Sequence, residues 1–502
     1  MLVKIILLVA FFASMIAVGI YSRKHATNVS DFVLGGRAVG PWLTAFAYGT
    51  SYFSAVVFVG YAGQFGYKYG IASTWIGIGN AVIGSLMAWV ILGRRTRVMT
   101  KHLSSSTMPD FFGKRYDSKA LRIAAAAIAF IFLIPYTASV YNGLSQLFGM
   151  AFNIKYSVCV IVMAVLTGVY VIVGGYMATA INDFIQGIIM IVGIIAVIVA
   201  VLNGQGGFTE AISKLAHVQG DSDVPGVYAS FFGPDLPNLL GVVLLTSLGT
   251  WGLPQMVQKF YAIKDEKSIK SGTVISTIFA ILVAGGSYFL GGFGRLFEVP
   301  MKDGSPIYDA IMPTMLSESL GDLLIGIVIV LVLSASMSTL SSLVLTSSST
   351  LTLDLIKGNI VKNMSEKKQL LVMRIMLAVF IIISVVIALD PPAFIAQLMG
   401  ISWGALAGAF LAPFMYGLYW KGVTKASVWA SFVCGVGITV INMIFPVIKS
   451  SINAGAIAMV AGLIIVPIVS LITPKMKKEK VDEMFSCMEE TVVVRRKRSI
   501  EE

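Results

Sequence analysis

The stretch Ser334–Thr350 reads SASMSTLSSLVLTSSST, and eleven of its seventeen residues carry a hydroxyl group. It lies inside a long apolar segment. Hydroxyl groups in hydrocarbon need partners, so they usually face a bundle interior or a hydrated cavity. Ser338, Thr339, Ser341 and Ser342 can share one helix face. A face of neutral oxygens suits a hard monovalent cation, whereas a divalent ion or a transition metal would need acids or imidazoles. The stretch therefore predicts a sodium site within a membrane-spanning helix.

Composition places the whole chain in the all-α polytopic membrane class. Of its 502 residues, 57% are apolar and 12% are charged, and the mean hydropathy is +0.86. We expect a single transmembrane domain over 1–474 and a solvated cytoplasmic tail over 475–502. The thirteen expected membrane-spanning helices cover roughly 2–22, 42–63, 71–92, 122–149, 156–175, 181–202, 237–258, 271–293, 321–355, 370–389, 394–419, 427–446 and 455–473.

The distribution of positive charge predicts how these spans are oriented in a cell membrane. With the N-terminus outside, 30 of the 37 Lys and Arg residues fall in segments on the inner side. The seven that remain outside are Lys4, Lys68, Lys155, Lys214, Arg295, Lys302 and Lys449. Basic residues concentrate on the cytoplasmic side of membrane proteins, so we expect an outside N-terminus and a cytoplasmic C-terminus. The basic run at 495–498 would then contact anionic lipid.

Two of the expected spans contain residues that interrupt a helix. The first is AYGTSYFSA (Ala47–Ala55), and the second is SLGTWGLPQ (Ser247–Gln255). Interrupted spans in corresponding positions point to a binding site near the middle of the membrane. Their spacing fits two inverted five-helix repeats, about 42–202 and 237–419, with one extra span before them and two after. The alternative is that these glycines only permit close helix packing.

Several function classes are disfavoured by what the sequence lacks. The net charge of +12 sits in loops, so we read it as topology and expect no nucleic-acid partner. No GxxxxGK[ST] phosphate loop and no metal-ligand cluster is present, which disfavours an enzyme or an ATP-driven pump. The alternative class is a membrane sensor or channel-like protein that keeps a transporter fold. The tail is too short for a signalling domain, and sodium-dependent uptake into vesicles would discriminate between the two.

Five blocks in order resemble the sodium:solute symporter family, most closely its sodium/proline symporter branch, over about residues 30–475. The blocks are FVLGGRAVGPWLTAF, GGYMATAINDFIQG, SLGTWGLPQMVQKFYA, SASMSTLSS and GAFLAPFMYGLYW. The resemblance implies a leucine-transporter-like fold, sodium as the coupling ion, and import of a small organic solute by alternating access.

The resemblance also implies a main sodium site. Its ligands would be the backbone carbonyls of Thr50, Phe53 and Ala335 and the hydroxyls of Ser338 and Thr339. An unwound turn at the first break would free carbonyls, and the hydroxyl face would supply the other ligands. The alternative is that both hydroxyls only bond back to their own helix.

A second sodium site is implied by similarity to the sialic-acid branch of the family. Asp183, Ser338, Ser341 and Ser342 would form it. Asp183 is an acid within an apolar neighbourhood, and such an acid needs a partner or a proton. The alternative is a helix N-cap or first-turn acid, because Asp183 lies close to the expected helix start at 181.

The solute remains open because the expected pocket departs from both better-known branches. Val56, Thr246 and Thr250 stand where the proline branch has aromatic side chains, although Tyr136 matches its third-helix tyrosine. Val56 and Val57 stand where the sugar branch has acid and amide groups. The residues expected to line the pocket are Tyr52, Tyr136, Tyr141, Asn142, Thr250, Trp251 and Gln397. They leave a neutral, zwitterionic or carboxylate solute possible, and an amino acid or a carboxylate-like compound is expected.

Overall fold

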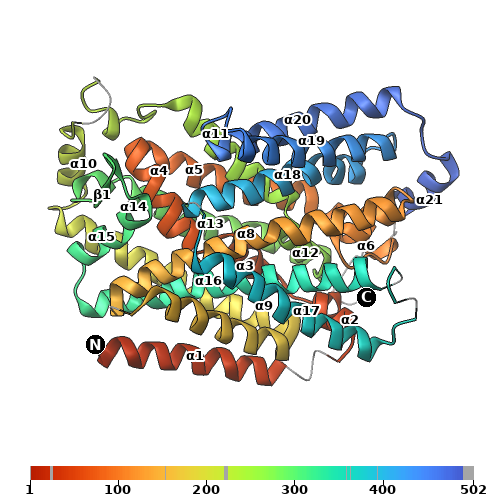
Figure 1. The fold of residues 1–502 in the computed structure, drawn as a ribbon, viewed down its shortest axis with the longest axis horizontal. Helices are drawn as coiled ribbons and strands as arrows, with labels where there is room; N and C mark the ends of the chain where they lie inside the picture. Colours follow the sequence, from red (N-terminus) through yellow and green to blue (C-terminus); the bar gives the residue numbers. More distant parts are fainter. Residues whose placement is uncertain are drawn as a thin grey trace, which may run out of the picture.

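The computed structural model describes residues 2–22, 27–152, 154–219, 224–357, 359–361, 363–392 and 394–489. In this part of the chain, long helices run side by side along one common direction (Figure 1). The only sheet described is a hairpin of two strands in a loop, β1 (Met301–Lys302) and β2 (Ser305–Pro306). The prediction of an all-α membrane protein is therefore confirmed.

The first half of the chain folds into helices of very different lengths. Its elements are α1 (Leu2–Ser22), α2 (Val29–Leu34), η2 (Gly35–Arg37), α3 (Pro41–Tyr52), η3 (Val56–Tyr61), α4 (Ala62–Tyr69), η4 (Gly70–Ser73), α5 (Thr74–Gly79), η5 (Asn80–Met87), η6 (Trp89–Gly93), α6 (Arg94–His102), α7 (Met108–Arg115), α8 (Lys119–Phe152), α9 (Tyr156–Gly204), α10 (Phe208–Ala216) and η7 (Val227–Ala229).

The second half of the chain repeats this mixture of short and long helices. Its elements are α11 (Leu236–Leu248), η8 (Gly249–Gly252), α12 (Pro254–Tyr261), α13 (Glu266–Ala280), η9 (Ile281–Gly285), α14 (Gly286–Gly291), η10 (Gly294–Leu296), η11 (Tyr308–Ala310), α15 (Ile311–Ser319), α16 (Asp322–Thr350), η12 (Leu351–Ile356), α17 (Glu366–Leu389), α18 (Ile395–Tyr419), α19 (Lys425–Ile444), α20 (Ser451–Ile472) and α21 (Lys478–Glu489).

The predicted number of thirteen spans is not confirmed. Within the described residues, ten helices are long and apolar enough to cross a membrane, or eleven if the bent pair Leu236–Gly252 and Pro254–Tyr261 is one span. The two counts differ because the prediction divided the chain by hydropathy, whereas the helices of the structure begin and end at other residues. The apolar stretch Tyr156–Val169 is too short to pass alone, and one continuous helical run over Val56–His102 joins parts of two predicted spans.

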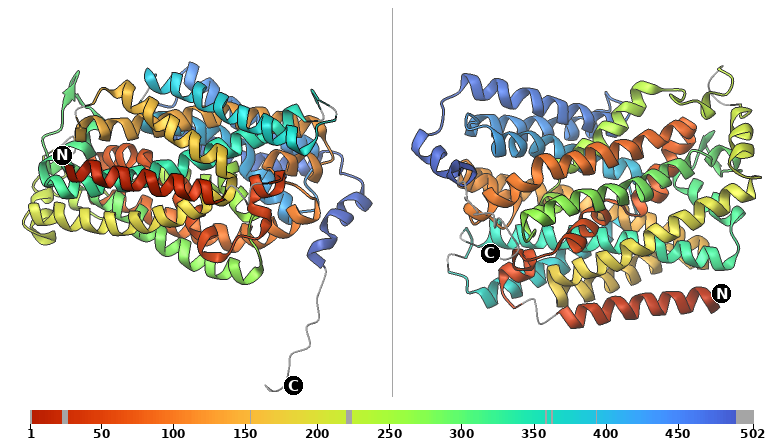
Figure 2. Two further views of the ribbon diagram at one scale, coloured as in Figure 1. Left: turned by 90° about the horizontal axis from the view of Figure 1, so that it is seen from below. Right: turned by 180° about the vertical axis from the view of Figure 1, so that it is seen from behind.

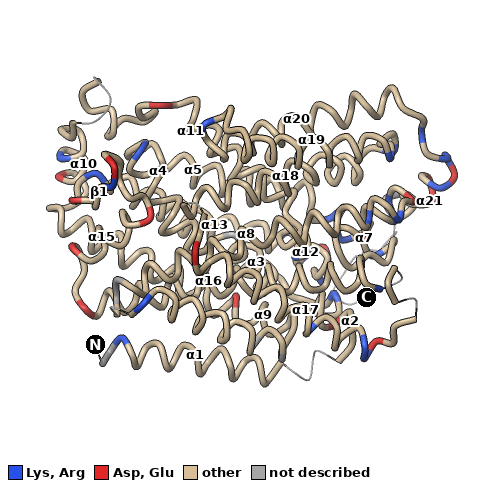
Figure 3. The backbone as a smooth tube through the Cα atoms, in the orientation of Figure 1, with Lys and Arg blue, Asp and Glu red and all other residues tan. Residues whose placement is uncertain are grey.

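Charged residues lie mainly toward the two ends of the long helices, and the middle of the bundle is largely uncharged (Figure 3). This distribution is the one expected of a protein whose middle lies in hydrocarbon. α1 lies on one side of the bundle against α9 and α16, while α19 and α20 pack together on the opposite side (Figures 1 and 2).

α16 lies at the centre of the bundle, which explains its composition. It packs against α3, α8, α9, α12 and α17. From Leu331 to Thr350 all of its residues are buried. Because this helix has protein on all sides, its hydroxyls can find partners inside the bundle and need not face lipid.

The tail predicted to be solvated is packed on the bundle over part of its length. α21 contacts α6. Lys480 Nζ lies 2.7 Å from Asp117 Oδ2, and Lys421 Nζ lies 2.8 Å from Asp482 Oδ1. The hydrogen bond from Lys480 lowers the pKa of the Asp117 carboxyl. Residues 478–489 therefore contact the bundle and still carry exposed side chains, and the basic run at 495–498 lies outside the described residues.

Candidate functional site

The first predicted break is confirmed. α3 begins with Pro41 in its first turn and ends at Tyr52, and Phe53 is extended with φ −88° and ψ 115°. The helix then resumes as η3 and α4. The last carbonyls of a helix receive no hydrogen bond from a backbone N–H of the same helix. An interruption at Phe53 therefore leaves carbonyl oxygens available in the middle of the bundle.

The second predicted break is confirmed as well. α11 passes into the 3₁₀ turn η8, Leu253 is extended with φ −86° and ψ 122°, and α12 starts at Pro254 after a bend of 47°. The alternative explanation, that the glycines permit close helix packing, is also met at this break. A Cβ at Gly252 would lie 2.8 Å from the Cα of Ala407 on α18. Gly252 therefore both lies at the helix break and permits close packing against α18.

Five oxygen atoms meet where the first break faces α16. The Ser338 hydroxyl lies 3.1 Å from the Thr50 carbonyl and 3.0 Å from the Ala335 carbonyl. The Thr339 hydroxyl lies 3.2 Å from the carbonyls of Thr50 and Phe53 and 3.1 Å from that of Ala335. All five residues are fully buried. We call these atoms the five-oxygen cluster, and they are the atoms predicted to hold the main sodium ion.

The chemistry of the five-oxygen cluster favours a cation. Its three carbonyls only accept hydrogen bonds, and each hydroxyl has one proton to donate. Two protons cannot satisfy five close oxygen contacts at once, so the cluster carries excess negative partial charge. The alternative that the hydroxyls bond back to their own helix is partly correct, because both hydroxyls contact the Ala335 carbonyl on α16. Back-bonding does not explain why the same hydroxyls also reach two carbonyls of the first break.

A second polar cluster lies beside the first and contains a residue that sequence reasoning missed. Lys259 on α12 is 2% exposed. Its ammonium donates to the Ser342 hydroxyl at 3.0 Å and lies 3.6 Å from Asp183 Oδ2. The Ser342 hydroxyl is 2.9 Å from that of Ser51. We call Asp183, Lys259, Ser342 and Ser51 the lysine cluster.

The residues predicted for a second sodium ion are only partly brought together. Asp183 and Ser342 both contact Lys259, whereas the Ser341 hydroxyl donates to the Ser338 carbonyl at 2.9 Å. The capping alternative for Asp183 is wrong. α9 is kinked at Gly175, where φ is 57°, so Asp183 lies about two turns into the helical run that follows. The second-sodium prediction itself stays a prediction.

The predicted solute-contacting residues divide into a buried group and an outer residue. Tyr136 and Tyr141 on α8 are fully buried, and the Tyr136 ring packs edge-on against Trp403 at 5.8 Å. Thr250 donates to the Ser247 carbonyl at 2.8 Å, and Trp251 donates to the Ile83 carbonyl at 3.0 Å. Both of these side chains thus have partners within the bundle.

The other three predicted residues are Asn142, which is also buried on α8 beside Tyr141, and then Gln397 and Tyr52. Asn142 accepts from the Tyr156 hydroxyl at 3.3 Å. Gln397 is exposed and lines an outer cavity. The side chain of Tyr52 lies outside what the structure describes. The prediction that these residues share one pocket therefore stays untested.

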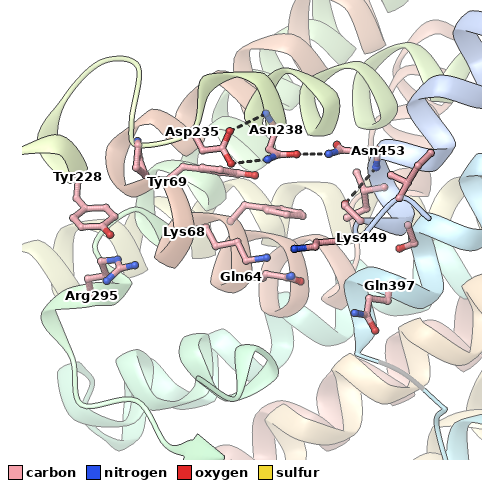
Figure 4. Close-up of a pocket in the computed structure, with 16 residues that line it drawn as sticks. Gln64, Lys68, Tyr69, Tyr228, Asp235, Asn238, Arg295, Gln397, Lys449 and Asn453 are labelled. Atoms are coloured by element: carbon pink, nitrogen blue, oxygen red, sulfur yellow. Dashed lines mark hydrogen bonds between the residues drawn. The ribbon is translucent and has the colours of Figure 1, made fainter. Parts of the chain in front are cut away.

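The outer cavity has a volume of about 740 Å³ and a basic lining. Lys68, Arg295 and Lys449 line it together with the acid Asp235. Figure 4 shows the side chains of Lys68 and Gln64 from α4 and of Lys449 from the segment before α20 converging on one space. The guanidinium carbon of Arg295 lies 3.9 Å from the centre of the Tyr228 ring, close enough for a cation–π contact. Three of the seven cationic residues predicted to lie outside are therefore gathered around one cavity.

Asp235 is already engaged by its own helix. It caps α11, accepting from the Asn238 backbone at 3.2 Å and from the Asn238 side chain at 2.5 Å (Figure 4). Its charge is therefore partly satisfied, and the cavity keeps a net positive character. The lining favours a solute group with negative charge.

The opposite end of the bundle is held together by Arg37. Its guanidinium donates to the Thr100 hydroxyl at 3.2 Å and to the Tyr261 carbonyl at 3.1 Å, and also to the Ser105 carbonyl. These contacts tie η2 to α6 and α12. A cavity on the predicted outer side thus accompanies tight contacts on the predicted inner side.

Comparison with known proteins gives consistent matches over nearly the whole chain. The sequence profile of the Sodium:solute symporter family matches residues 32–435. The osmoregulated proline transporter OpuE of Bacillus subtilis (strain 168) is 28% identical over 497 residues, covering 97% of this chain and 98% of its own length. The sodium/proline symporter of Staphylococcus aureus (strain JH9) is 29% identical over 492 residues, covering 94% of this chain and 93% of its own length.

Two solved structures share the fold. A Na⁺-coupled sialic acid symporter in a substrate-bound outward-open state has a TM-score of 0.76 and 17% identity, covering 95% of this chain and 98% of its own. The nucleobase-cation-symport-1 family transporter Mhp1 in a closed conformation has a TM-score of 0.52 and 11% identity, covering 91% and 99%. At these identities the likeness supports the fold alone.

Proposed function

The chain belongs to the sodium:solute symporter family, and from this premise we propose that it imports a carboxylate-bearing solute, such as an amino acid, with sodium bound at the five-oxygen cluster. Family and relatives support sodium-coupled solute import, and the two relatives named above are proline transporters. The observation that carries the assignment of the site is a set of five hydroxyl–carbonyl contacts of 3.0–3.2 Å, which bring together five buried oxygens of α16 and the first break.

The position of the cluster suggests how sodium couples to transport. Thr50 and Phe53 belong to the first predicted repeat, about 42–202, whereas Ala335, Ser338 and Thr339 belong to the second, about 237–419. An ion that bridges them favours conformations in which α3 and α16 are in contact, and its release removes that preference. With the N-terminus outside and the C-terminus in the cytoplasm, as the charge distribution predicts, the Arg37 contacts and a cavity larger on the outer side (about 740 Å³) than on the inner side (about 500 Å³) support an outward-facing arrangement. This arrangement is one state of an alternating-access cycle.

One sodium ion supplies enough free energy for useful accumulation. Moving one positive charge through 100 mV contributes ~2.3 kcal/mol. A tenfold sodium gradient adds ~1.4 kcal/mol. For a neutral or zwitterionic solute, the sum corresponds to accumulation of roughly several hundredfold.

The most direct test of the proposed function is uptake into proteoliposomes that contain the purified full chain. L-proline is the first probe because of the two relatives, and other amino acids and simple carboxylates follow. We expect accumulation under an inward sodium gradient and none when potassium replaces sodium on both sides. A transported solute should also raise thermal stability, by ~2.7 kcal/mol at 100 times its dissociation constant. Equal uptake in sodium and in potassium would contradict sodium coupling.

The basic outer cavity makes a separate prediction about the solute. Lys449→Gln removes an exposed positive charge from the cavity lining. We expect KM for a carboxylate solute to rise about three- to tenfold at low ionic strength, with an unchanged maximal rate, because exposed charges mainly affect encounter. The difference should shrink at high salt, where screening is strong.

The matched control is Lys214→Gln. Lys214 also belongs to the predicted outer charges, but it lies on α10, where it donates to the Gln205 carbonyl at 2.8 Å. We expect wild-type KM for this variant. Equal effects of both variants would indicate a general surface-charge effect, and no effect of Lys449→Gln would remove the cavity from the solute pathway.

A further inference from the structure

Lys259 is a positive charge in a place where positive charge is rare. It is 2% exposed, it lies on the short helix α12 after the second break, and it reaches an acid on α9 and a serine on α16. Its ammonium also lies 5.1 Å from the centre of the Tyr176 ring, close enough for a cation–π contact. Two groups of α9 and one of α16 therefore surround the ammonium of a residue on α12.

The acid in this cluster depends on that ammonium. Asp183 is fully buried, and among the described residues no hydrogen bond within 3.5 Å reaches either of its carboxylate oxygens. Its negative charge is therefore offset by Lys259 at 3.6 Å and not by neutral donors. A buried carboxylate needs such a partner, and any cation of suitable size could serve.

The lysine cluster adjoins the five-oxygen cluster along two helices. Ser342 lies one turn beyond Ser338 on α16, and Ser51 follows Thr50 at the end of α3. The hydroxyls of Ser342 and Ser51 are 2.9 Å apart, so α3 and α16 contribute residues to both clusters. A second mobile cation beside Lys259 would face its positive charge in a low-dielectric interior, where such repulsion is strong.

We propose that the ammonium of Lys259 is the resident cation of the lysine cluster, so that the protein binds one sodium ion and not two. This inference rests on the proposed function, because it assumes that sodium binds at the five-oxygen cluster. Lys259 then sets the sodium stoichiometry. It takes the position that the sequence predicted for a second sodium ion, and it is a positioning residue that also links α12 to α9 and α16.

A purely structural ion pair is the competing explanation, and only the number of bound ions distinguishes it. If the pair were structural, removing it would lower stability but would leave the number of sodium sites unchanged. If Lys259 replaces an ion, its removal exposes a carboxylate and a serine hydroxyl to sodium. Lys259→Ala should therefore gain a sodium site that the wild type lacks.

The experiment is equilibrium binding of radioactive sodium to the purified full chain, which requires no knowledge of the solute. We expect one ion per chain for the wild type and for Lys259→Arg, and two for Lys259→Ala. The double variant Lys259→Ala, Asp183→Asn removes both charges and should return to one. Two ions on the wild type, or one on folded Lys259→Ala, would overturn the inference. No ion on the wild type would instead refute the proposed sodium site.

Stability provides a second readout if Lys259→Ala folds poorly at low sodium. Its Tm should rise with sodium concentration more steeply than that of the wild type, because an ion then restores the missing charge. The double variant should show the wild-type dependence. A Lys259→Ala protein whose Tm follows sodium no more steeply than the wild type would count against a replaced ion.

Discussion

The double variant Ser338→Ala, Thr339→Ala should lose apparent sodium affinity by about 30-fold or more. It removes both hydroxyl ligands of the five-oxygen cluster and leaves the three carbonyls. Each hydroxyl contact contributes roughly 1–1.5 kcal/mol, and the loss of two corresponds to about 30- to 150-fold in a binding constant. The measurement is the sodium dependence of uptake into proteoliposomes.

Solute affinity at saturating sodium should change little, since neither hydroxyl is placed in the solute pocket. The matched control is Ser348→Ala on the same helix, because that hydroxyl bonds back to the Leu345 carbonyl at 3.1 Å. Its sodium dependence should match the wild type. Wild-type sodium affinity in the double variant would show that the cluster does not bind the coupling ion.

Gly66→Ala should be strongly destabilising, because α4 and α14 touch through their backbones. A Cβ at Gly66 would lie 2.1 Å from the carbonyl carbon and oxygen of Gly291. No side-chain rotation can relieve a clash with backbone atoms, so the helices must move apart. Overpacking typically costs about 1–3 kcal/mol and sometimes more. We expect a clearly lower Tm in detergent and a smaller fraction of monodisperse protein.

Gly291→Ala tests the same contact from the other side, since its Cβ would lie 2.0 Å from the Ala62 carbonyl oxygen. The control is Gly437→Ala on α19, where no atom lies within 4 Å of the added Cβ. Alanine is the better helix former, so this control should be neutral or slightly stabilising. Equal Tm values for all three variants would show that α4 and α14 are not in backbone contact.

Much of the candidate sodium site could be predicted because its signals are local in sequence. The hydroxyl-rich stretch that contains Ser338 and Thr339 stands out within a long apolar segment. The interruption of α3 after Tyr52 follows from a run of small and polar residues. Both signals come from residues within one or two turns of each other. Family resemblance was needed to bring Thr50 and Phe53 to α16, because nothing local relates segments almost 300 residues apart.

The residues that were missed depend on long-range packing. Hydropathy ended the seventh predicted span at residue 258, so Lys259 was counted with the charges of an inner loop. Only the bend before Pro254 and the packing of α12 against α16 bring it beside Asp183. The outer cavity is a similar case, since Lys68, Arg295 and Lys449 lie far apart in the sequence.

The capping alternative for Asp183 failed for a physical reason that composition does not reveal. Polar residues around 181–183 suggested a helix start there. The backbone instead turns at Gly175, where a positive φ is favourable for glycine and costly for other residues. The helix therefore starts earlier, and Asp183 becomes a buried side chain in the middle of the bundle.

The central claim is that the five-oxygen cluster holds the coupling sodium ion. The most direct measurement is a pair of high-resolution structures of the full chain, one determined in sodium and one with choline in its place. We predict density that appears only in sodium, within ligand distance of the carbonyls of Thr50, Phe53 and Ala335 and of the hydroxyls of Ser338 and Thr339. Identical density at this position in both structures, or sodium-dependent density elsewhere in the bundle alone, would contradict the account.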